Sequence, residues 1–299
     1  MARSVKAPVI IDPRLNTTVI AYDDVGYVVI PNALDSARLL RTREESVALC
    51  RGDRGAIDGV TSASPADGDD VVLRRYLCIH FPHKISPLLR DVARVPAVIT
   101  ALTDIIGPNV KLMQSMLFIK SEGRPGQAWH QDETHIPTRD RSLTACWIAL
   151  DDATTANGCL WVIPGSHRAG VLYPDRDQHD PRFDCTREAY GFGYRDDDAV
   201  PVELPAGAAL LFDGHLLHRS LPNDGPPGTR RALVNHYMSA ESLLPWRHPA
   251  ADEPMGTADH RDILLVAGRD PYAFKGTVDI MRPHIRTDGH GGCAPMTDR

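Results

Sequence analysis

The sequence contains no CxxC pair, no basic excess and no long apolar run, and each absence argues against a class of protein. Without paired cysteines, neither a zinc–thiolate site nor a dithiol redox motif is expected. The formal net charge of −6 offers no basic field for nucleic acid or an anionic membrane. No stretch of 18 apolar residues is present, so we expect no membrane span.

The cysteines and the first residues favour a cytoplasmic location. The six cysteines are Cys50, Cys78, Cys146, Cys159, Cys185 and Cys293. Because they are scattered, we expect them to be reduced and partly buried, which suits a reducing compartment. The beginning of the chain, MARSVKAPVIIDPRLN, lacks the apolar core of a secretory signal.

The composition is that of a globular protein large enough to fold without disulfides. The 299 residues are 42% hydrophobic and 24% charged. This length fits one large β domain or two ordinary domains, and no internal repeat is present. The order of the predicted helices and strands therefore decides between one domain and two.

The first third of the sequence predicts mostly helices. Residues 26–32, GYVVIPN, indicate a short strand, and residues 35–50 indicate a helix with an Asp or Ser cap. Residues 52–70 are rich in Gly, Asp and Ser and predict a loop. Residues 86–106 predict one or two helices around Pro96.

The pattern changes to short β-rich runs from about residue 110 to residue 240. Gly, Pro and Asp turns separate these runs, which is typical of a β-sandwich or jelly roll. We therefore predict a mainly β fold with flanking helices and a single domain over residues 1–299. It would consist of a helical N-terminal portion (1–109), a jelly-roll core (110–244) and a C-terminal extension (245–299).

The stretch QAWHQDETH (residues 127–135) follows a Gly/Pro-rich run and suggests a metal site. In a strand, His130 and Asp132 would share a face, and Gln131 would point the opposite way. Iron sites with two histidines and one carboxylate need a second histidine. In LLFDGHLLHRSLPN the candidates are His215 and His218, and we favour His218 because it begins an extended run.

An arginine at the start of a β run provides a second unusual feature. Arg230 in GTRRALVNHY would face inward together with Ala232 and Val234, whereas Arg231 would be an exposed strand-edge charge. A buried guanidinium is suited to binding a carboxylate. Arg230 could therefore hold the far end of a dicarboxylate that chelates a metal.

These segments together resemble the phytanoyl-CoA dioxygenase family, which includes ectoine hydroxylases. The resemblance begins at DDVGYVVIPNALD and continues through WHQD, NGCLWVIPGSH and LLFDGHLLHRSLPN to the later arginine, in the family's order. Members are Fe(II)- and 2-oxoglutarate-dependent oxygenases on a double-stranded β-helix, a jelly-roll, cupin-like fold. The resemblance thus covers most of the chain.

The resemblance implies a set of site residues and a reaction. It assigns the Fe(II) ligands to the catalytic residues His130, Asp132 and His218. It assigns 2-oxoglutarate binding to Arg230, Ser220, Gln131, Trp147 and Gln114. The implied reaction uses O2, releases succinate and CO2, and oxidises an unactivated C–H bond. Because Asp132 is present where halogenating relatives have a small residue, hydroxylation or a related oxidation is expected.

Several other polar residues are expected to have structural roles. Glu133 and His135 are interpreted as loop-surface residues. His80 and His83 have metal-like spacing, but no nearby carboxylate completes a site, so they are interpreted as structural or pocket residues.

Two other functions remain as alternatives. The same triad could serve a non-oxidative cupin-type metalloenzyme (an isomerase or lyase), although such an enzyme has no need for the Arg230 clamp. A non-catalytic binding relative is the other alternative, against which the intact ligand set argues.

The substrate would be a small molecule. It could be amino-acid-like, a natural product or an acyl-CoA, although no clear basic patch for CoA phosphates is present. Residues 52–70, residues 171–200 and the C-terminal extension are expected to shape its pocket.

Overall fold

Two antiparallel β-sheets face each other in the computed structural model. The structure describes residues 18–184, 186–225, 228–242, 263–277, 279 and 281–286. The large sheet has the order β1-β10-β5-β12-β3-β2-β14, with β13 paired to β3, and the small sheet has the order β4-β11-β6-β9. Every strand pair in both sheets is antiparallel. This mainly β architecture agrees with the predicted fold class.

The strands of the large sheet are β1 (Tyr27–Ile30), β2 (Cys78–His80), β3 (Val110–Ser121), β5 (Thr144–Ala149), β10 (Ala209–Asp213), β12 (Thr229–Ser239), β13 (Leu264–Ala267) and β14 (His284–Arg286). Those of the small sheet are β4 (Gln127–His130), β6 (Leu160–Val162), β9 (Val200–Val202) and β11 (His218–Ser220). A separate hairpin consists of β7 (Asp175–Arg176) and β8 (Glu188–Ala189).

The helices are α1 (Thr18–Val25), α2 (Ser36–Arg51), α3 (Asp69–Leu73), α4 (Pro87–Val92), α5 (Pro96–Ile106) and α6 (Asp132–His135). The 3-10 turns are η1 (Pro82–Lys84), η2 (Ser166–Ala169), η3 (Asp196–Asp198) and η4 (Ala273–Lys275). Asp35 caps α2, because its carboxylate accepts a hydrogen bond from the backbone N–H of Arg38. Pro96 divides the predicted 86–106 segment into two helices by occupying the first turn of α5.

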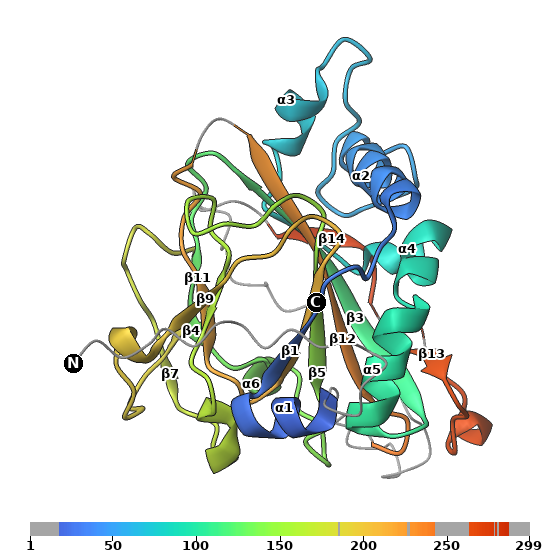
Figure 1. The fold of residues 1–299 in the computed structure, drawn as a ribbon. Helices are drawn as coiled ribbons and strands as arrows, with labels where there is room; N and C mark the ends of the chain where they lie inside the picture. Colours follow the sequence, from blue (N-terminus) through green and yellow to red (C-terminus); the bar gives the residue numbers. More distant parts are fainter. Residues whose placement is uncertain are drawn as a thin grey trace, which may run out of the picture.

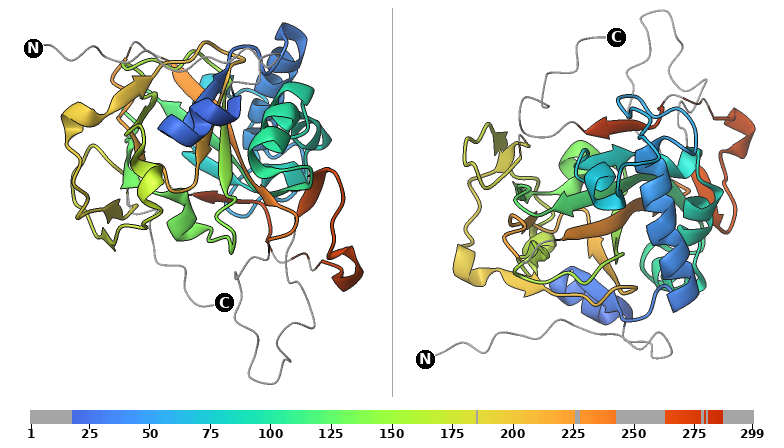
Figure 2. Two further views of the ribbon diagram at one scale, coloured as in Figure 1. Left: turned by 60° about the horizontal axis from the view of Figure 1, so that its bottom comes forward. Right: turned by 90° about the horizontal axis from the view of Figure 1, so that it is seen from above.

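Alternation along the strands gives the large sheet two different faces. Leu233 on β12 belongs to the core under the helices, whereas Ala232 and Val234 belong to the core between the two sheets. Helices α2, α4 and α5 lie on the side of the large sheet away from β4, β9 and β11 (Figure 1), and the views in Figure 2 agree. The inner face of the large sheet therefore lines the space between the two sheets.

All three predicted portions of the chain contribute strands to the large sheet. Strand β1, which was expected from residues 26–32, and strand β2 come from the N-terminal portion, and β13 and β14 come from the C-terminal extension. The short strands β1 and β2 gain stability from pairing with β10 and β3, which local sequence patterns do not reveal. The C-terminal extension thus contributes an edge strand, β14, to the large sheet.

Four of the cysteines, Cys50, Cys78, Cys146 and Cys159, are free and buried, as the scattered pattern predicted. Cys185 and Cys293 lie outside the described residues. Within the part of the chain that the structure describes, no helix has the length and apolar character required to cross a membrane.

Candidate active site

A cavity of about 680 Å³ lies between the two sheets and contains most of the predicted site residues. Its wall combines inward-facing residues of β3 and β12 with residues of β4 and β11. Volumes of this size are typical of pockets that hold small ligands. The predicted residues that line it are His130, Asp132, His218, Arg230, Ser220, Trp147 and Gln114.

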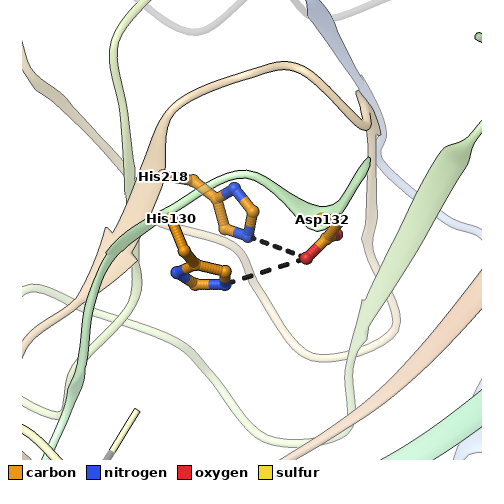
Figure 3. Close-up of side chains that lie close together, drawn as sticks. All are labelled: His130, Asp132 and His218. Carbon is orange, nitrogen blue, oxygen red and sulfur yellow. Dashed lines mark ion pairs between the residues drawn. The ribbon is translucent and has the colours of Figure 1, made fainter. Parts of the chain in front are cut away.

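His130, Asp132 and His218 converge at one point of this cavity. Their side chains point toward one another in Figure 3. One oxygen of Asp132 (Oδ1) lies 3.8 Å from His130 Nε2 and 3.6 Å from His218 Nε2. All three are buried, and among the described residues they form the one cluster whose donor atoms are close enough to share a metal ion. Their role as ligands remains a prediction that this geometry supports.

Hydrogen bonds orient both imidazoles toward that point. The Nδ1 atom of His130 lies 2.7 Å from the Ala128 carbonyl oxygen, and that of His218 lies 2.9 Å from the Leu216 carbonyl oxygen. Donation by Nδ1–H to these carbonyls leaves each Nε2 with a free lone pair. Burial, with a smaller contribution from His218, lowers the pKa of His130 well below its ordinary value. Both features suit neutral imidazoles that bind a metal.

The local backbone differs from the strand expected for His130-Gln131-Asp132. Strand β4 ends at His130, and Asp132 begins the helical turn α6. The two side chains therefore meet because the chain turns after Gln131, and strand alternation does not explain their proximity. Gly126, directly before β4, permits the close approach of this segment to β11, because a Cβ there would lie 1.9 Å from the Ser220 carbonyl oxygen.

Strand pairing decides between the two candidate histidines. His218 is the register partner of His130, and their ring centroids are 4.0 Å apart. His215 is also buried but does not line the cavity, and its ring lies 3.6 Å from Asp213 instead. The structure therefore brings His218, and not His215, to the predicted metal ligands.

His236, which the sequence pattern did not single out, holds the second oxygen of Asp132. Its Nε2 lies 3.2 Å from Asp132 Oδ2, which leaves Oδ1 to face His130 and His218. Burial alone raises the pKa of Asp132, but His218, His236 and His130 outweigh it and hold that pKa well below its ordinary value. The carboxylate is thus ionised and fixed in orientation.

Arg230 forms the second part of the site together with Lys120, a residue that the sequence analysis did not identify. Arg230 and Lys120 are register partners on β12 and β3, and both are buried. Lys120 Nζ donates to Ser220 Oγ at 2.9 Å and to the Leu221 carbonyl at 2.7 Å. Arg230 Nη2 donates to the Gly158 carbonyl, and the guanidinium lies 5.2 Å from the ring of Trp147.

These two cations have no carboxylate partner among the described residues. No ion pair involves either of them there, and the buried Nε of Arg230 has no hydrogen-bond partner in that part of the chain. Burial, followed by the charge of Arg230, lowers the pKa of Lys120 well below its ordinary value. Burial lowers the pKa of Arg230 to about 10. Two adjacent buried cations with an unpaired N–H form a site that fits a carboxylate.

Of the two glutamines expected near 2-oxoglutarate, only Gln114 lines the cavity. Gln114 is the register partner of His236. Gln131 points away, as alternation would suggest, and its amide bonds to the Val171 and His215 carbonyls and to the Tyr173 N–H. Gln131 thus connects the 171–200 segment to the turn between β10 and β11, and its placement contradicts a direct role in cofactor binding.

The remaining polar residues differ from their expectations in two cases. Glu133, expected at a loop surface, is buried and accepts hydrogen bonds from the N–H and hydroxyl of Thr138. Arg231, expected as an exposed strand-edge charge, is largely buried in an ion pair with Asp151 at 2.8 Å. His135 is exposed and lines the cavity.

His80 and His83 have the structural and pocket roles expected for them. His80 lines the cavity, whereas His83 is buried against Ser115. Neither residue is part of a group of possible metal ligands in the described chain.

With the geometry established, comparison with known proteins gives the family. The profile of the family "Phytanoyl-CoA dioxygenase (PhyH)" matches residues 22–232. The chain belongs to this family. The match includes the triad, Ser220 and Arg230, which confirms the resemblance read from the sequence.

Curated relatives in this family match over part of their length. Phytanoyl-CoA dioxygenase 1 of rice (Oryza sativa subsp. japonica) is 34% identical over 164 residues, which cover 54% of this chain and 57% of that protein. A probable phytanoyl-CoA dioxygenase of Caenorhabditis elegans is 28% identical over 236 residues, 72% of each chain. The chain thus spans somewhat over half the length of the rice relative.

Solved structures share the fold at lower identity. The epimerase SnoN, in complex with Fe3+, alpha ketoglutarate and nogalamycin RO, has a TM-score of 0.61 at 21% identity, covering 87% of this chain and 98% of that one. EctD from S. alaskensis with bound Fe has a TM-score of 0.58 at 21% identity, covering 79% and 82%. These similarities confirm the double-stranded β-helix predicted for this family member.

Proposed function

We propose that the protein is an Fe(II)- and 2-oxoglutarate-dependent oxygenase that oxidises a C–H bond of a small molecule. The observation that carries the proposal is the pairing of two sites in one cavity. The His130–Asp132–His218 triad fits a divalent metal. Lys120 and Arg230, which form no ion pair with another described residue, fit a carboxylate. Family membership supports the proposal. Two structures of the same fold also support it: SnoN in complex with Fe3+ and alpha ketoglutarate, and EvdO2 complexed with 2-oxoglutarate.

The donor set favours iron among divalent metals. Two imidazoles and one carboxylate leave open coordination positions, which is the ligand type of non-haem Fe(II) oxygenases. When bound, Fe(II) and 2-oxoglutarate would supply the oxidising chemistry, in which O2 converts 2-oxoglutarate to succinate and CO2 and a substrate C–H bond is oxidised. The presence of Asp132 as the third ligand favours hydroxylation or a related oxidation over halogenation.

The chain's own residues would position the reactants and exclude water. His130, His218 and Asp132 Oδ1 would hold the metal, and His236 would fix Asp132 through its other oxygen. Arg230 and Lys120 would bind the distal carboxylate of 2-oxoglutarate, with Ser220 orienting Lys120 and Trp147 covering the guanidinium. Both cations are desolvated before the ligand arrives, so their attraction for a carboxylate is little screened by water.

An anaerobic titration tests this function in the wild-type protein. We expect Fe(II) followed by 2-oxoglutarate to produce a metal-to-ligand charge-transfer band in the visible spectrum. The matched ligand 2-oxobutyrate keeps the chelating end but lacks the distal carboxylate. It should therefore produce the band only at a much higher concentration than 2-oxoglutarate does. Folded protein that binds iron without producing a band with 2-oxoglutarate would instead favour a non-oxidative cupin-type enzyme or a binding relative.

Replacing His236 tests the orientation of Asp132. We expect His236→Ala to weaken Fe(II) binding by about tenfold or more, because hydrogen-bonded partners of metal ligands typically contribute that much. His236→Gln, whose amide can still donate to Asp132, should recover part of the loss. The dissociation constant of Fe(II) for each variant, measured by anaerobic titration, checks both expectations. Equal affinities in wild type and both variants would show that His236 has no positioning role.

A further inference from the structure

The part of the cavity away from the triad is formed by the edge of the large sheet. Strand β14 pairs with β2, and β2 pairs with β3, so that Arg286, Cys78 and Phe118 lie in one row across the strands. The next row contains His284, His80 and Met116. The 171–200 segment closes this end with Asp184, Thr186 and Arg187.

Arg286 is held at this end by contacts that, among the described residues, leave part of its guanidinium available. Its Nη1 lies 3.2 Å from Asp184 Oδ2, and the guanidinium lies 5.7 Å from the ring of Phe118. Arginine has five N–H donors in a planar fork, and this ion pair uses one side of it. Asp184 and Phe118 thus orient a cation whose remaining donors can bind a second partner.

Asp184 is itself rigidly placed. Its Oδ1 accepts hydrogen bonds from the Thr186 N–H at 3.0 Å and the Thr186 hydroxyl at 2.5 Å. Its backbone N–H donates to the Gly126 carbonyl at 2.8 Å, next to the strand that carries His130. The carboxylate side chain is only 4% exposed. Asp184 is therefore suited to fixing Arg286 relative to the metal site.

Arg286 and the Lys120–Arg230 pair are placed to bind different groups. Two strand spacings, about 10 Å, separate β3 from β14. One 2-oxoglutarate that spans the triad and the Lys120–Arg230 pair would have both of its ends bound without Arg286. Arg286 thus remains for the substrate.

The charge of the cavity is opposite to that of the protein. Four lysine or arginine side chains and two aspartates line it, an excess of two positive charges in a chain of net charge −6. Divalent iron and dianionic 2-oxoglutarate would cancel each other, so this excess would persist in the loaded enzyme. A positive, partly enclosed cleft favours anionic ligands.

The neighbours of Arg286 supply apolar and uncharged polar contacts. His80 and His284 stack with ring centroids 4.7 Å apart, and burial, followed by Arg286, lowers the pKa of His80 to about 2. His284 Nδ1 lies 2.9 Å from the Arg282 carbonyl, so its Nε2 remains as an acceptor. Met116 and Phe118 line the same cavity as the triad. The site therefore combines one oriented cation with an apolar channel.

We propose that Arg286 binds an anionic group of the substrate, a carboxylate or a phosphate, and that Asp184 orients it. This inference rests on the proposed function and names the substrate class for the same cavity. The anion would bind at the β2–β14 edge while an apolar part of the substrate extends past Met116 toward the triad. The C-terminal strand would thus select the substrate.

The test uses hexanoate and hexyl phosphate as anionic probes, with hexanamide and hexylamine as neutral and cationic controls. Each is titrated into the full chain loaded anaerobically with Fe(II) and excess 2-oxoglutarate, with binding measured by calorimetry. We expect at least one anion to bind about tenfold or more tighter than hexanamide, as for a charge-assisted hydrogen-bonded pair. The stronger of the two anions identifies carboxylate or phosphate as the preferred group.

Variants locate the anion site. Arg286→Gln should abolish the preference for the anion, and Arg286→Lys, which keeps the charge, should retain part of it. The matched control is Arg182→Gln. Arg182 pairs with Asp180 within the 171–200 segment but does not line the cavity. A cooperative thermal unfolding transition is the evidence that each variant is folded. A preference that persists in folded Arg286→Gln overturns the proposal.

The charge-transfer band separates failure of this inference from failure of the proposed function. No band with 2-oxoglutarate in the wild type means that the proposed function fails. A band that persists while charged and neutral probes bind equally, or none binds, overturns only the assignment to Arg286. Loss of the band as hexanoate binds also overturns it, because the probe would then occupy the Lys120–Arg230 site.

Discussion

His218→Ala is expected to abolish tight Fe(II) binding and to reduce 2-oxoglutarate turnover by a factor on the order of a thousand or more. His218 supplies one of three converging donors, and residues that act as a unit lose most of their effect when one is removed. The two donors that remain, His130 and Asp132, come from one turn of chain and cannot enclose the ion. Iron content after anaerobic loading and succinate release measure the two effects.

The matched control for this substitution is His215→Gln. His215 lies three residues away and is equally buried, but it faces Asp213 and does not line the cavity. We expect its iron content and turnover to equal those of the wild type. If His215→Gln lost iron and His218→Ala retained it, the assignment of the second histidine would be reversed.

Arg230→Ala is expected to raise the concentration of 2-oxoglutarate needed for half-maximal charge-transfer absorbance by about a hundredfold, the scale of truncating one partner of a buried charge pair. The substitution removes the guanidinium whose Nε has no partner within the described chain. Binding of 2-oxobutyrate, which lacks the distal carboxylate, should change little. The ratio of the two affinities therefore measures the contribution of Arg230 to the distal carboxylate alone.

The adjacent arginine provides a control with the same charge. Arg231 faces the opposite side of β12 and pairs with Asp151, so Arg231→Ala should leave 2-oxoglutarate affinity unchanged while lowering thermal stability. Because Lys120 remains in Arg230→Ala, some preference for 2-oxoglutarate over 2-oxobutyrate should persist. Equal weakening of both keto acids in Arg230→Ala would place Arg230 outside the distal carboxylate site.

Local sequence patterns predicted the candidate site residues of this protein and much of its architecture. The Gly-Pro run followed by His130 and Asp132 and the histidines near residue 218 are short-range features of the sequence. Strand alternation also predicted correctly that Arg230 faces the same side of its strand as Ala232 and Val234. The break between helices α4 and α5 at Pro96 and the cap of helix α2 by Asp35 likewise depend on adjacent residues. The mainly β class followed from the spacing of turns between apolar runs.

Only the tertiary structure decided which distant residues meet. Strand register placed His218 opposite His130 and excluded His215, and it brought Lys120 beside Arg230, although Lys120 lies in an apolar strand without any motif. Arg286 and Asp184 are 102 residues apart and meet because β14 joins the edge of the sheet. Hydrogen-bonding side chains can be buried only where partners exist, and those partners come from other strands. The sequence alone therefore identified the residue types that the reaction requires, whereas packing of the two sheets decided which of them share the cavity.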